Sequence, residues 1–499
     1  MYRILAAITL VALVCNGAIG QTGRSQLPKG LDALLQLTDA AERALAEDDA
    51  KEARQLLATV HAAPDFGRLD EDRRHFVLAR AGELASAAAD FSQAHALYSS
   101  ATGLQRADSD DWMGRLNAAW FVGDFDDAVT SLAMLARHWP GELAFVSQWA
   151  VEALIDHSRD TELSTEFGLL EALFESGWQT DLGLEPTQLW LRLLERYVEE
   201  ERVSDALTVA SRLRDPMAIV SIRADQRFSA LVASAPEWFS VTEASDAGII
   251  EARLSVEDHP DLLAPAVALT ELLLQAGRAQ DALLVIDTHL ARSAIKTVVG
   301  ASFDDAVEES VRALTAKALA LIALERWNEA AEQIELAASQ TLPQNRSDDF
   351  FAVAMLQARL GQPDAALATL KKIPVQQQTP QAELVRFVAA RARSDEAGAQ
   401  AALTELLAAE DTAGAQAQRA LLIAGQLDEA AELLIRRLND PLQRGRALLE
   451  IQSMREQHWP DAALDWQTRA VQLLQRDDVR RSVAASGANV GDYALYRWN

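Results

Sequence analysis

A short spacing that recurs along the chain most constrains its fold: a turn residue is followed, five positions later, by an alanine. Gly277 and Ala282 frame Arg-Ala-Gln-Asp, and Gly425 and Ala430 frame Gln-Leu-Asp-Glu. Glycine tolerates the positive φ that closes a helix at its C-terminus, and alanine lets a second helix cross the first closely. The acidic residues between them fall in the first turn of the second helix, where the helix dipole favours them. The spacing therefore predicts short helix-turn-helix hairpins.

Copies of this unit extend over most of the chain. Those with glycine at the turn are Gly123 to Ala128, Gly277 to Ala282, Gly361 to Ala366 and Gly425 to Ala430. Those with another residue are Ala89 to Ala94, Glu201 to Ala206, Glu325 to Ala330, Ala392 to Ala397, Gln457 to Ala462 and a weaker copy, Asp48 to Ala53. Successive alanines are 41, 34, 78, 76, 48, 36, 31, 33 and 32 residues apart. The two large values are about twice one repeat of roughly 34 to 40 residues, so we expect two less recognisable copies there.

These residues resemble the tetratricopeptide repeat (TPR) family. One register of the resemblance is carried by Leu269 to Leu273, Gly277, Ala282 and Ile286, and another by Trp327, Ala330, Ile334 and Ala337. It covers most of residues 31–476 and implies an all-α fold, a TPR-like right-handed superhelix of stacked helix-turn-helix hairpins. Composition agrees, because helix-forming residues dominate and β-branched residues form no runs.

Interruptions of the helical periodicity predict how the chain is organised. We expect helical-repeat arrays over residues 21–214 and 261–476. Between them, Asp215-Pro216, Ala235-Pro236 and His259-Pro260 interrupt the pattern, so residues 215–260 are predicted to form an irregular hinge or boundary. Residues 477–499 are expected to form a C-terminal tail or cap, with Tyr493, Tyr496 and Trp498 folding back over the last hairpin.

The first twenty residues have the pattern of a secretory signal peptide. Arg3 precedes the apolar stretch Ile4 to Val14, and Ala18-Ile19-Gly20 offers small residues for cleavage before Gln21. Eleven apolar residues are too few for a membrane span, which needs about 20. We therefore expect the signal to be cleaved after Gly20 and the protein to be periplasmic or secreted. After cleavage, the chain is not expected to insert directly into the membrane. A lipoprotein signal at Cys15 and an uncleaved anchor are the alternatives.

Cysteine usage and charge exclude several classes of function. Cys15 is the only cysteine, so the cleaved chain would have no disulfide and no thiol chemistry. Without Arg3, 45 basic side chains face 74 acidic ones, a net charge of −29 that repels nucleic acid and anionic lipid. Residues 386–499 differ from the rest, with 14 arginines against 16 acidic residues. Solvated helix faces explain this asymmetry, and a docking surface is the alternative.

Recognisable catalytic and metal-binding motifs are missing from the sequence. The eight histidines show no paired ligand spacing, and no nucleophile elbow, phosphate loop or dinucleotide fingerprint occurs. Asp108, Asp110 and Asp111 lack the glycine and the terminal glutamate of a calcium loop, and we expect them to cap a helix that begins near Asp111. The sequence therefore predicts no enzyme, no catalytic residue, no cofactor and no metal. Carboxylate pairs of the kind that hydrolyse glycosides stay open, because 74 acidic residues produce chance pairs.

The predicted function is a non-catalytic scaffold of the cell envelope that binds a protein or peptide partner. In TPR-like hairpins the first helix lines the concave face, and this register places Met113, Asn117 and Trp120 there as a partner-binding site. Some members of the TPR family bind a terminal carboxylate with a clamp of basic side chains. Met113 stands where such a clamp would need a lysine, so the clamp is missing here. In the competing interpretation, Trp120 packs between hairpins. Alternative functions are a superhelical module related to cell-wall lytic enzymes and a structural oligomerisation scaffold.

Overall fold

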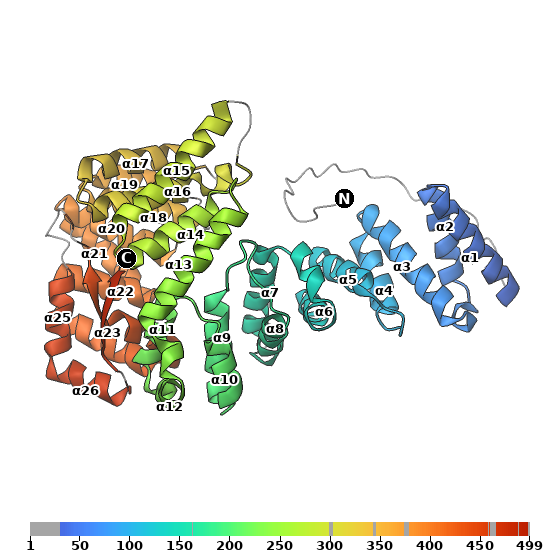
Figure 1. Ribbon diagram of the computed structural model, residues 1–499, viewed down its shortest axis with the longest axis horizontal. Coiled ribbons are helices and arrows are strands. Elements are labelled where there is room, and N and C mark those ends of the chain that lie inside the picture. The colour runs from blue at the N-terminus through green and yellow to red at the C-terminus, as the bar shows by residue number, and fades with distance from the viewer. Residues whose placement is uncertain are drawn as a thin grey trace. The chain divides into compact units, whose positions relative to one another are not determined.

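The described part of the chain is built almost entirely from helices (Figure 1). The computed structural model describes residues 30–161, 163–298, 303–342, 346–373, 379–457, 459, 466–487 and 489–497. The expected signal peptide, residues 1–20, lies outside these ranges. The predicted all-α fold of stacked helix-turn-helix hairpins is confirmed. Within the described ranges, no helix combines the length and the apolar character that a membrane crossing requires.

The chain divides into two compact units, Met1–Asp181 and Leu182–Asn499. The described part of the first unit consists of consecutive antiparallel helices, each packed on the next. They are α1 (Leu31–Ala46), α2 (Ala50–His61), η1 (Phe66–Arg68), α3 (Glu71–Ala87), α4 (Phe91–Ala101), α5 (Ser109–Val122), α6 (Phe125–His138), η2 (Pro140–Phe145), α7 (Gln148–Thr161) and α8 (Leu163–Glu175).

The second unit continues the hairpins and ends in a small sheet. Its elements are α9 (Thr187–Glu199), α10 (Val203–Ala210), α11 (Pro216–Ala224), η3 (Gln226–Phe228), α12 (Ser229–Ser234), η4 (Pro236–Phe239), α13 (Val241–Asp258), α14 (Ala264–Gln275), α15 (Ala279–Val298), α16 (Ala306–Ala323), α17 (Trp327–Gln340), α18 (Ser347–Arg359), α19 (Pro363–Leu370), α20 (Pro380–Ala392), α21 (Glu396–Ala408), α22 (Glu410–Ala424), α23 (Leu427–Asn439), α24 (Pro441–Glu450), β1 (Ser453–Glu456), α25 (Gln467–Gln475), α26 (Asp477–Ala485) and β2 (Asp492–Arg497).

The turns of the hairpins have the backbone conformation that the recurring spacing predicts. Positive φ angles occur at the four predicted glycines and at four predicted turn residues that are not glycine: Gly123, Gly277, Gly361, Gly425, Asp48, Ala89, Glu201 and Glu325. The alanine five positions after each of these turns is fully buried: Ala53, Ala94, Ala128, Ala206, Ala282, Ala330, Ala366 and Ala430. A methyl group at each crossing point therefore lets the two helices of a hairpin approach closely.

One predicted turn is displaced by two residues. The expected pair Ala392 and Ala397 is wrong, because helix α20 continues to Ala392 and Ala397 is exposed. The turn residue is Ser394, with φ of 58°, and the buried anchor is Ala399. The side chain of Asp395 accepts a hydrogen bond from the backbone N–H of Gly398 and so begins the second helix.

The two long gaps in the alanine spacing contain further helices. The first gap holds the hairpin of α7 and α8, and the second holds α11, α12 and α13. In the second gap, Pro216 lies in the first turn of α11, and the side chain of Asp215 accepts a hydrogen bond from the backbone N–H of Met217. Proline at this position starts a helix because its missing N–H has no partner there anyway. That residues 215–260 act as a hinge or boundary stays a prediction.

The C-terminal residues form the one sheet of the described chain, which the sequence did not predict. Strands β1 and β2 pair in parallel. The helical hairpin expected to turn at Gln457 is wrong, because the residues directly before Gln457 form strand β1 instead of a helix. The side-chain amide of Gln457 donates to the carbonyl of Ile322, at 3.0 Å. Tyr496 of β2 lies so close to Gly277 that an added Cβ there would be 2.6 Å from its Cε2. Ala462 and Trp498 lie outside the described residues.

Candidate partner-binding site

Helix α5 carries the three residues that the sequence predicts to bind a partner, and both of its ends are capped. The side chain of Asp108 accepts from the backbone N–H groups of Asp110 and Asp111, and the carboxylate of Asp111 accepts from the N–H of Asp108. The predicted capping role of this acidic cluster is confirmed. At the other end, Gly123 adopts φ of 80° and Asp124 caps α6. The caps fix where helix α5 begins and ends.

Met113, Asn117 and Trp120 are all half-buried on one stripe of α5. The side chain of Asn117 makes no hydrogen bond to any residue that the structure describes. Its amide therefore keeps both a donor and an acceptor for another molecule. Whether these three residues bind a partner stays a proposal.

Trp120 is the centre of a cluster of rings that the sequence did not predict as a group. Its ring lies 5.4 Å from that of Phe125 in α6 and 5.4 Å from that of Trp149 in α7, both in edge-to-face geometry. Phe125 in turn lies 5.3 Å from the ring of His157. Trp149 is 62% exposed. We call Trp120, Phe125, Trp149 and His157 the aromatic patch.

The tryptophans of residues 112–238 differ in exposure. Trp112, Trp178 and Trp190 are buried, as packing between hairpins requires, whereas Trp149 and Trp238 are exposed. A large exposed ring costs solvation free energy unless something covers it. Trp149 is thus distinguished from the buried tryptophans by exposure, which a sequence does not reveal.

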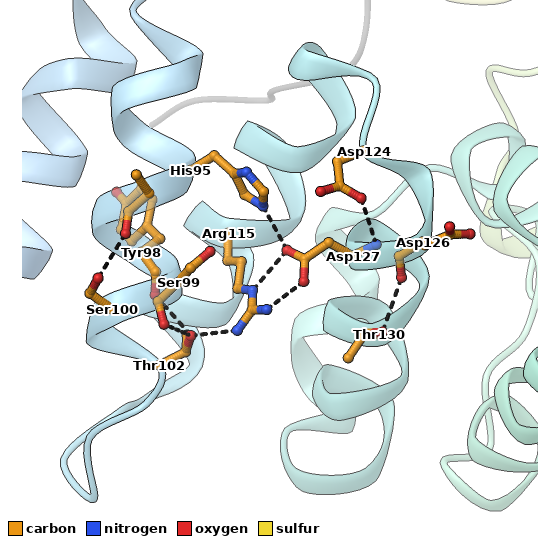
Figure 2. Close-up of polar contacts among 11 residues, drawn as sticks. His95, Tyr98, Ser99, Ser100, Thr102, Arg115, Asp124, Asp126, Asp127 and Thr130 are labelled. Atoms are coloured by element: carbon orange, nitrogen blue, oxygen red, sulfur yellow. Dashed lines mark hydrogen bonds and ion pairs between the residues drawn. The ribbon is translucent and has the colours of Figure 1, made fainter.

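A half-buried polar network joins α4, α5 and α6 (Figure 2). Arg115 of α5 donates to both carboxylate oxygens of Asp127 in α6, from Nε to Oδ2 at 2.8 Å and from Nη2 to Oδ1. Its Nη1 donates to the hydroxyl of Thr102 at 2.8 Å, and His95 Nε2 lies 2.8 Å from Asp127 Oδ2. Figure 2 also shows Asp124 accepting from the backbone N–H of Asp127. The network fixes α5 and α6, two of the three helices that carry the patch.

Asp127 is ionised in this network. Burial alone would raise the pKa of its carboxyl, but the hydrogen bonds from Arg115 and His95 and the charge of Arg115 outweigh burial and lower the pKa. The carboxylate is already engaged by a guanidinium and an imidazole, so it acts as a structural bridge between helices.

Three histidines of the first unit pair with aspartates about one repeat away. His75 pairs with Asp111, His95 with Asp127, and His157 with Asp126, at separations of 36, 32 and 31 residues. The absence of a paired ligand spacing among the histidines gave no sign of these pairs. An aspartate one repeat before or after a histidine was the signal that could have found them.

The surface around the aromatic patch is acidic. Asp124, Asp126 and Glu152 are exposed, and the side chain of Asp126 keeps 75% of its surface accessible although it contacts His157 at 3.0 Å. Residues 108–160 contain ten acidic and three basic side chains. Such a surface favours cationic groups on a partner. No cluster of three or more histidine, cysteine or acidic side chains suited to a metal ion occurs in the part of the chain that the structure describes.

Comparisons with known proteins give distant structural likenesses. No protein-family pattern and no curated protein sequence matches the chain. Similar solved structures include the APC/C hetero-tetramer Cut9–Hcn1, with 14% identity over 91% of this chain and 90% of that chain and a TM-score of 0.28. A tetratricopeptide repeat protein of Parabacteroides merdae has 11% identity over 66% of this chain and 100% of its own, with a TM-score of 0.26. Yeast Tom70 has 10% identity over 91% and 99%, with a TM-score of 0.25. At these scores the likenesses carry no inference about function.

Proposed function

We propose that this chain is a non-catalytic scaffold that binds an extended segment of a partner protein on the first-helix face of its first unit. The observation that carries the proposal is the exposed ring of Trp149 beside Trp120, on the same face as the unpaired amide of Asn117. Met113 completes the apolar part of this surface. Aromatic side chains with a nearby polar group are typical of binding hot spots.

The chemistry of this surface favours a partner segment that alternates apolar and basic side chains. The amide of Asn117 can pair with a backbone N–H and C=O of an extended chain. The ring of Trp149 offers an apolar platform that also attracts a cation over its face. The acidic residues Asp124, Asp126 and Glu152 complement lysine or arginine and repel an acidic peptide.

The polar network of Arg115 and Asp127 supports this role because it holds the surface in place before a partner arrives. Arg115 ties α5 to α6 through Asp127 and to Thr102, the C-terminal cap of α4. A surface that is already ordered loses less conformational entropy on binding. The network therefore supports recognition, since its carboxylate is not available for chemistry.

We also propose that the scaffold acts outside the cytoplasm, in the periplasm or as a secreted protein of the envelope. The support is the pattern of residues 1–20, with Arg3, the apolar stretch and the small residues before Gln21. Intact-mass analysis of the exported protein should give a chain that begins at Gln21. A mass that corresponds to an acylated chain beginning at Cys15 would contradict this part of the proposal.

The binding proposal is tested by calorimetric titration of the full chain with two synthetic peptides. The first, acetyl-Lys-Leu-Lys-Leu-Lys-Leu-amide, is expected to bind, with an affinity that falls as salt rises. The second has glutamate in place of lysine and is expected not to bind. Trp149→Ala should weaken binding about tenfold and Asn117→Ala about fivefold, as expected when ~1 to 1.4 kcal/mol of contact is lost.

A matched control and a stability readout keep this test decisive. Trp238→Ala removes another exposed tryptophan, in the second unit, and should leave peptide affinity unchanged. Trp149→Ala and Asn117→Ala should leave the melting temperature nearly unchanged, whereas Trp120→Ala should lower both affinity and stability, because its ring packs on two others. Unchanged affinity in both Trp149→Ala and Asn117→Ala, or equal binding of the two peptides, would exclude this surface as the binding site.

A further inference from the structure

The second unit has a cavity on the face formed by the first helices of its hairpins. Helices α16, α18, α20 and α22 each precede the turn of a hairpin, and they line the cavity together with α24. Its volume is about 290 Å³. A smaller cavity of about 110 Å³ adjoins it and shares Ala415, Arg419 and Arg446 with it. The larger volume lies at the lower end of the ~300 to 1,000 Å³ that ligand pockets usually have, so a small ligand fits it.

Most of the cavity wall is apolar. Side chains from three successive first helices contribute, among them Leu319 of α16, Phe351 and Met355 of α18, and Leu384 and Val385 of α20. This part of the wall can bury a hydrocarbon chain, since about 25 cal/mol is gained for each Å² of apolar surface removed from water.

Three arginines form the polar side of the cavity, and no acidic side chain is among the described residues that line it. Arg359, Arg419 and Arg446 come from α18, α22 and α24. The guanidinium of Arg359 lies 3.6 Å from the ring centre of Trp459, and that of Arg419 lies 5.3 Å from that of Trp466. Arg419 makes no ion pair with any carboxylate in the described ranges.

The carboxylate of Glu450, whose charge acts on Arg419, is already shared by two other arginines. Glu450 contacts Arg437 at 2.7 Å and Arg446 at 3.5 Å. Arg497 adds a further positive charge nearby, and it donates to the carbonyls of Glu450 and Leu449. The cluster therefore carries more positive than negative charge, although the chain as a whole is strongly acidic.

The electrostatics of the cluster follow from this imbalance. Burial, together with the like charge of Arg419, lowers the pKa of Arg359 to about 9. Burial also lowers the pKa of Arg419. Guanidinium groups held away from water cost free energy unless an anion compensates them.

A buried amide in the cavity wall also lacks a partner. Gln416 is 6% exposed, and its Oε1 has no hydrogen-bond partner. A ligand that brings a bound water to this oxygen, or that turns the amide so that Nε2 donates to a carboxylate, would satisfy it. The wall thus has apolar surface, excess positive charge and an unsatisfied polar group in one place.

We propose that this cavity binds a small amphiphilic carboxylate, a straight-chain carboxylic acid of about eight carbons in its anionic form. The carboxylate lies between Arg419 and Arg446, where planar guanidinium groups can donate two parallel hydrogen bonds. The hydrocarbon chain lies along Leu319, Met355 and Leu384. This site belongs to the second unit and is independent of the peptide surface of the first unit.

The proposal is tested by calorimetric titration of the full chain with octanoate. Octanoate should bind, whereas acetate, which lacks the chain, and 1-octanol, which lacks the charge, should each bind at least tenfold more weakly. Arg419→Gln should weaken octanoate binding at least tenfold. Arg326→Gln, which removes an exposed arginine paired with Glu329, is the matched control and should not change the affinity.

A second variant guards against loss of the fold. Arg419→Met keeps the apolar stem and removes the charge, so the chain without ligand should melt at the same temperature or a higher one while octanoate binding is lost. Several results would overturn the proposal: no binding of octanoate, equal binding of acetate, or full affinity in Arg419→Gln. A lower melting temperature of Arg419→Met, or tighter binding of a peptide with a free C-terminal carboxylate than of octanoate, would do so as well.

Discussion

Exchanging glycine and alanine at two turns of the first unit tests how the hairpins are closed. Ala89 has φ of 57° and Gly123 has φ of 80°, so both turns use the left-handed region. We predict that Ala89→Gly stabilises the first unit and that Gly123→Ala destabilises it. The pair is well matched, because each turn joins the two helices of one hairpin and both hairpins belong to the same unit.

The magnitude follows from backbone strain alone. A Cβ added at Gly123 meets no heavy atom within 4 Å, so no steric overlap contributes. An L-residue in the left-handed region costs about 1 to 2 kcal/mol, while glycine loses about 0.5 to 1 kcal/mol more conformational entropy on folding than alanine. The difference is about 0.5 to 1 kcal/mol in favour of glycine at either turn.

Urea denaturation monitored by tryptophan fluorescence measures the effect. With a slope of about 2 kcal/mol per molar urea, the midpoint of the first unit should rise by about 0.3 to 0.5 M in Ala89→Gly and fall by a similar amount in Gly123→Ala. Gly141→Ala is the control: Gly141 has no positive φ and no atom near its added Cβ, so this variant should gain stability. Shifts of the same sign in Ala89→Gly and Gly123→Ala would show that the left-handed backbone does not decide the stability of these turns.

Three further predictions concern the interior of the first unit. Burial and the charge of Glu83 raise the pKa of Tyr98 to about 12. Because the phenol of the unfolded chain ionises near pH 10, the free energy of unfolding should fall by about 2 to 3 kcal/mol between pH 10 and 12. In alkaline denaturation, Tyr98→Phe should abolish this loss. Gly114→Ala should lower the free energy of unfolding by about 1 to 3 kcal/mol in urea melts, because the added methyl group would overlap the ring of Tyr98. Adding Tyr98→Leu to this variant should restore the lost stability and so confirm the cause. The pKa of Asp127 is lower in the folded chain than in the unfolded chain, so its ionisation adds stability above the unfolded pKa, and this stability is lost as the pH falls through the folded pKa. Asp127→Asn should remove this loss of stability in acid. The same variant should lower the free energy of unfolding by about 2 to 3 kcal/mol at pH 7, since Arg115 loses its charged partner.

The hairpins could be predicted from the sequence because each one is a local structure. A turn residue with positive φ and an alanine five positions later lie within one crossing of two helices, so short spacings contain the necessary information. The displaced turn at Ser394 shows the limit, since alanines at 397 and 399 both fit the pattern and only packing decides between them. Both candidate anchors are alanines, so no side chain in the sequence distinguishes the buried one from the exposed one.

Contacts between distant parts of the chain could not be predicted in the same way. Strand β1 pairs with β2 across 39 residues at Ser453 and Asp492, and neither strand has the alternating pattern of a buried strand. Arg359, Arg419 and Arg446 are far apart in sequence and resemble the solvated charges of any helix surface. Their convergence depends on the stacking of first helices. Trp149 and Asn117 were both visible in the sequence, but the exposure of the ring and the unpaired amide were not.

On the proposed function, the first-helix face of the first unit binds an extended basic and apolar segment. Hydrogen–deuterium exchange of the full chain, with and without the alternating lysine–leucine peptide, tests it most directly. We predict that protection increases in α5 and at the start of α7, around Met113 to Trp120 and Trp149, and that α2, α4 and α8 are unchanged. Protection confined to other helices, or no change in α5 at peptide concentrations that saturate the chain, would show that the partner segment binds elsewhere.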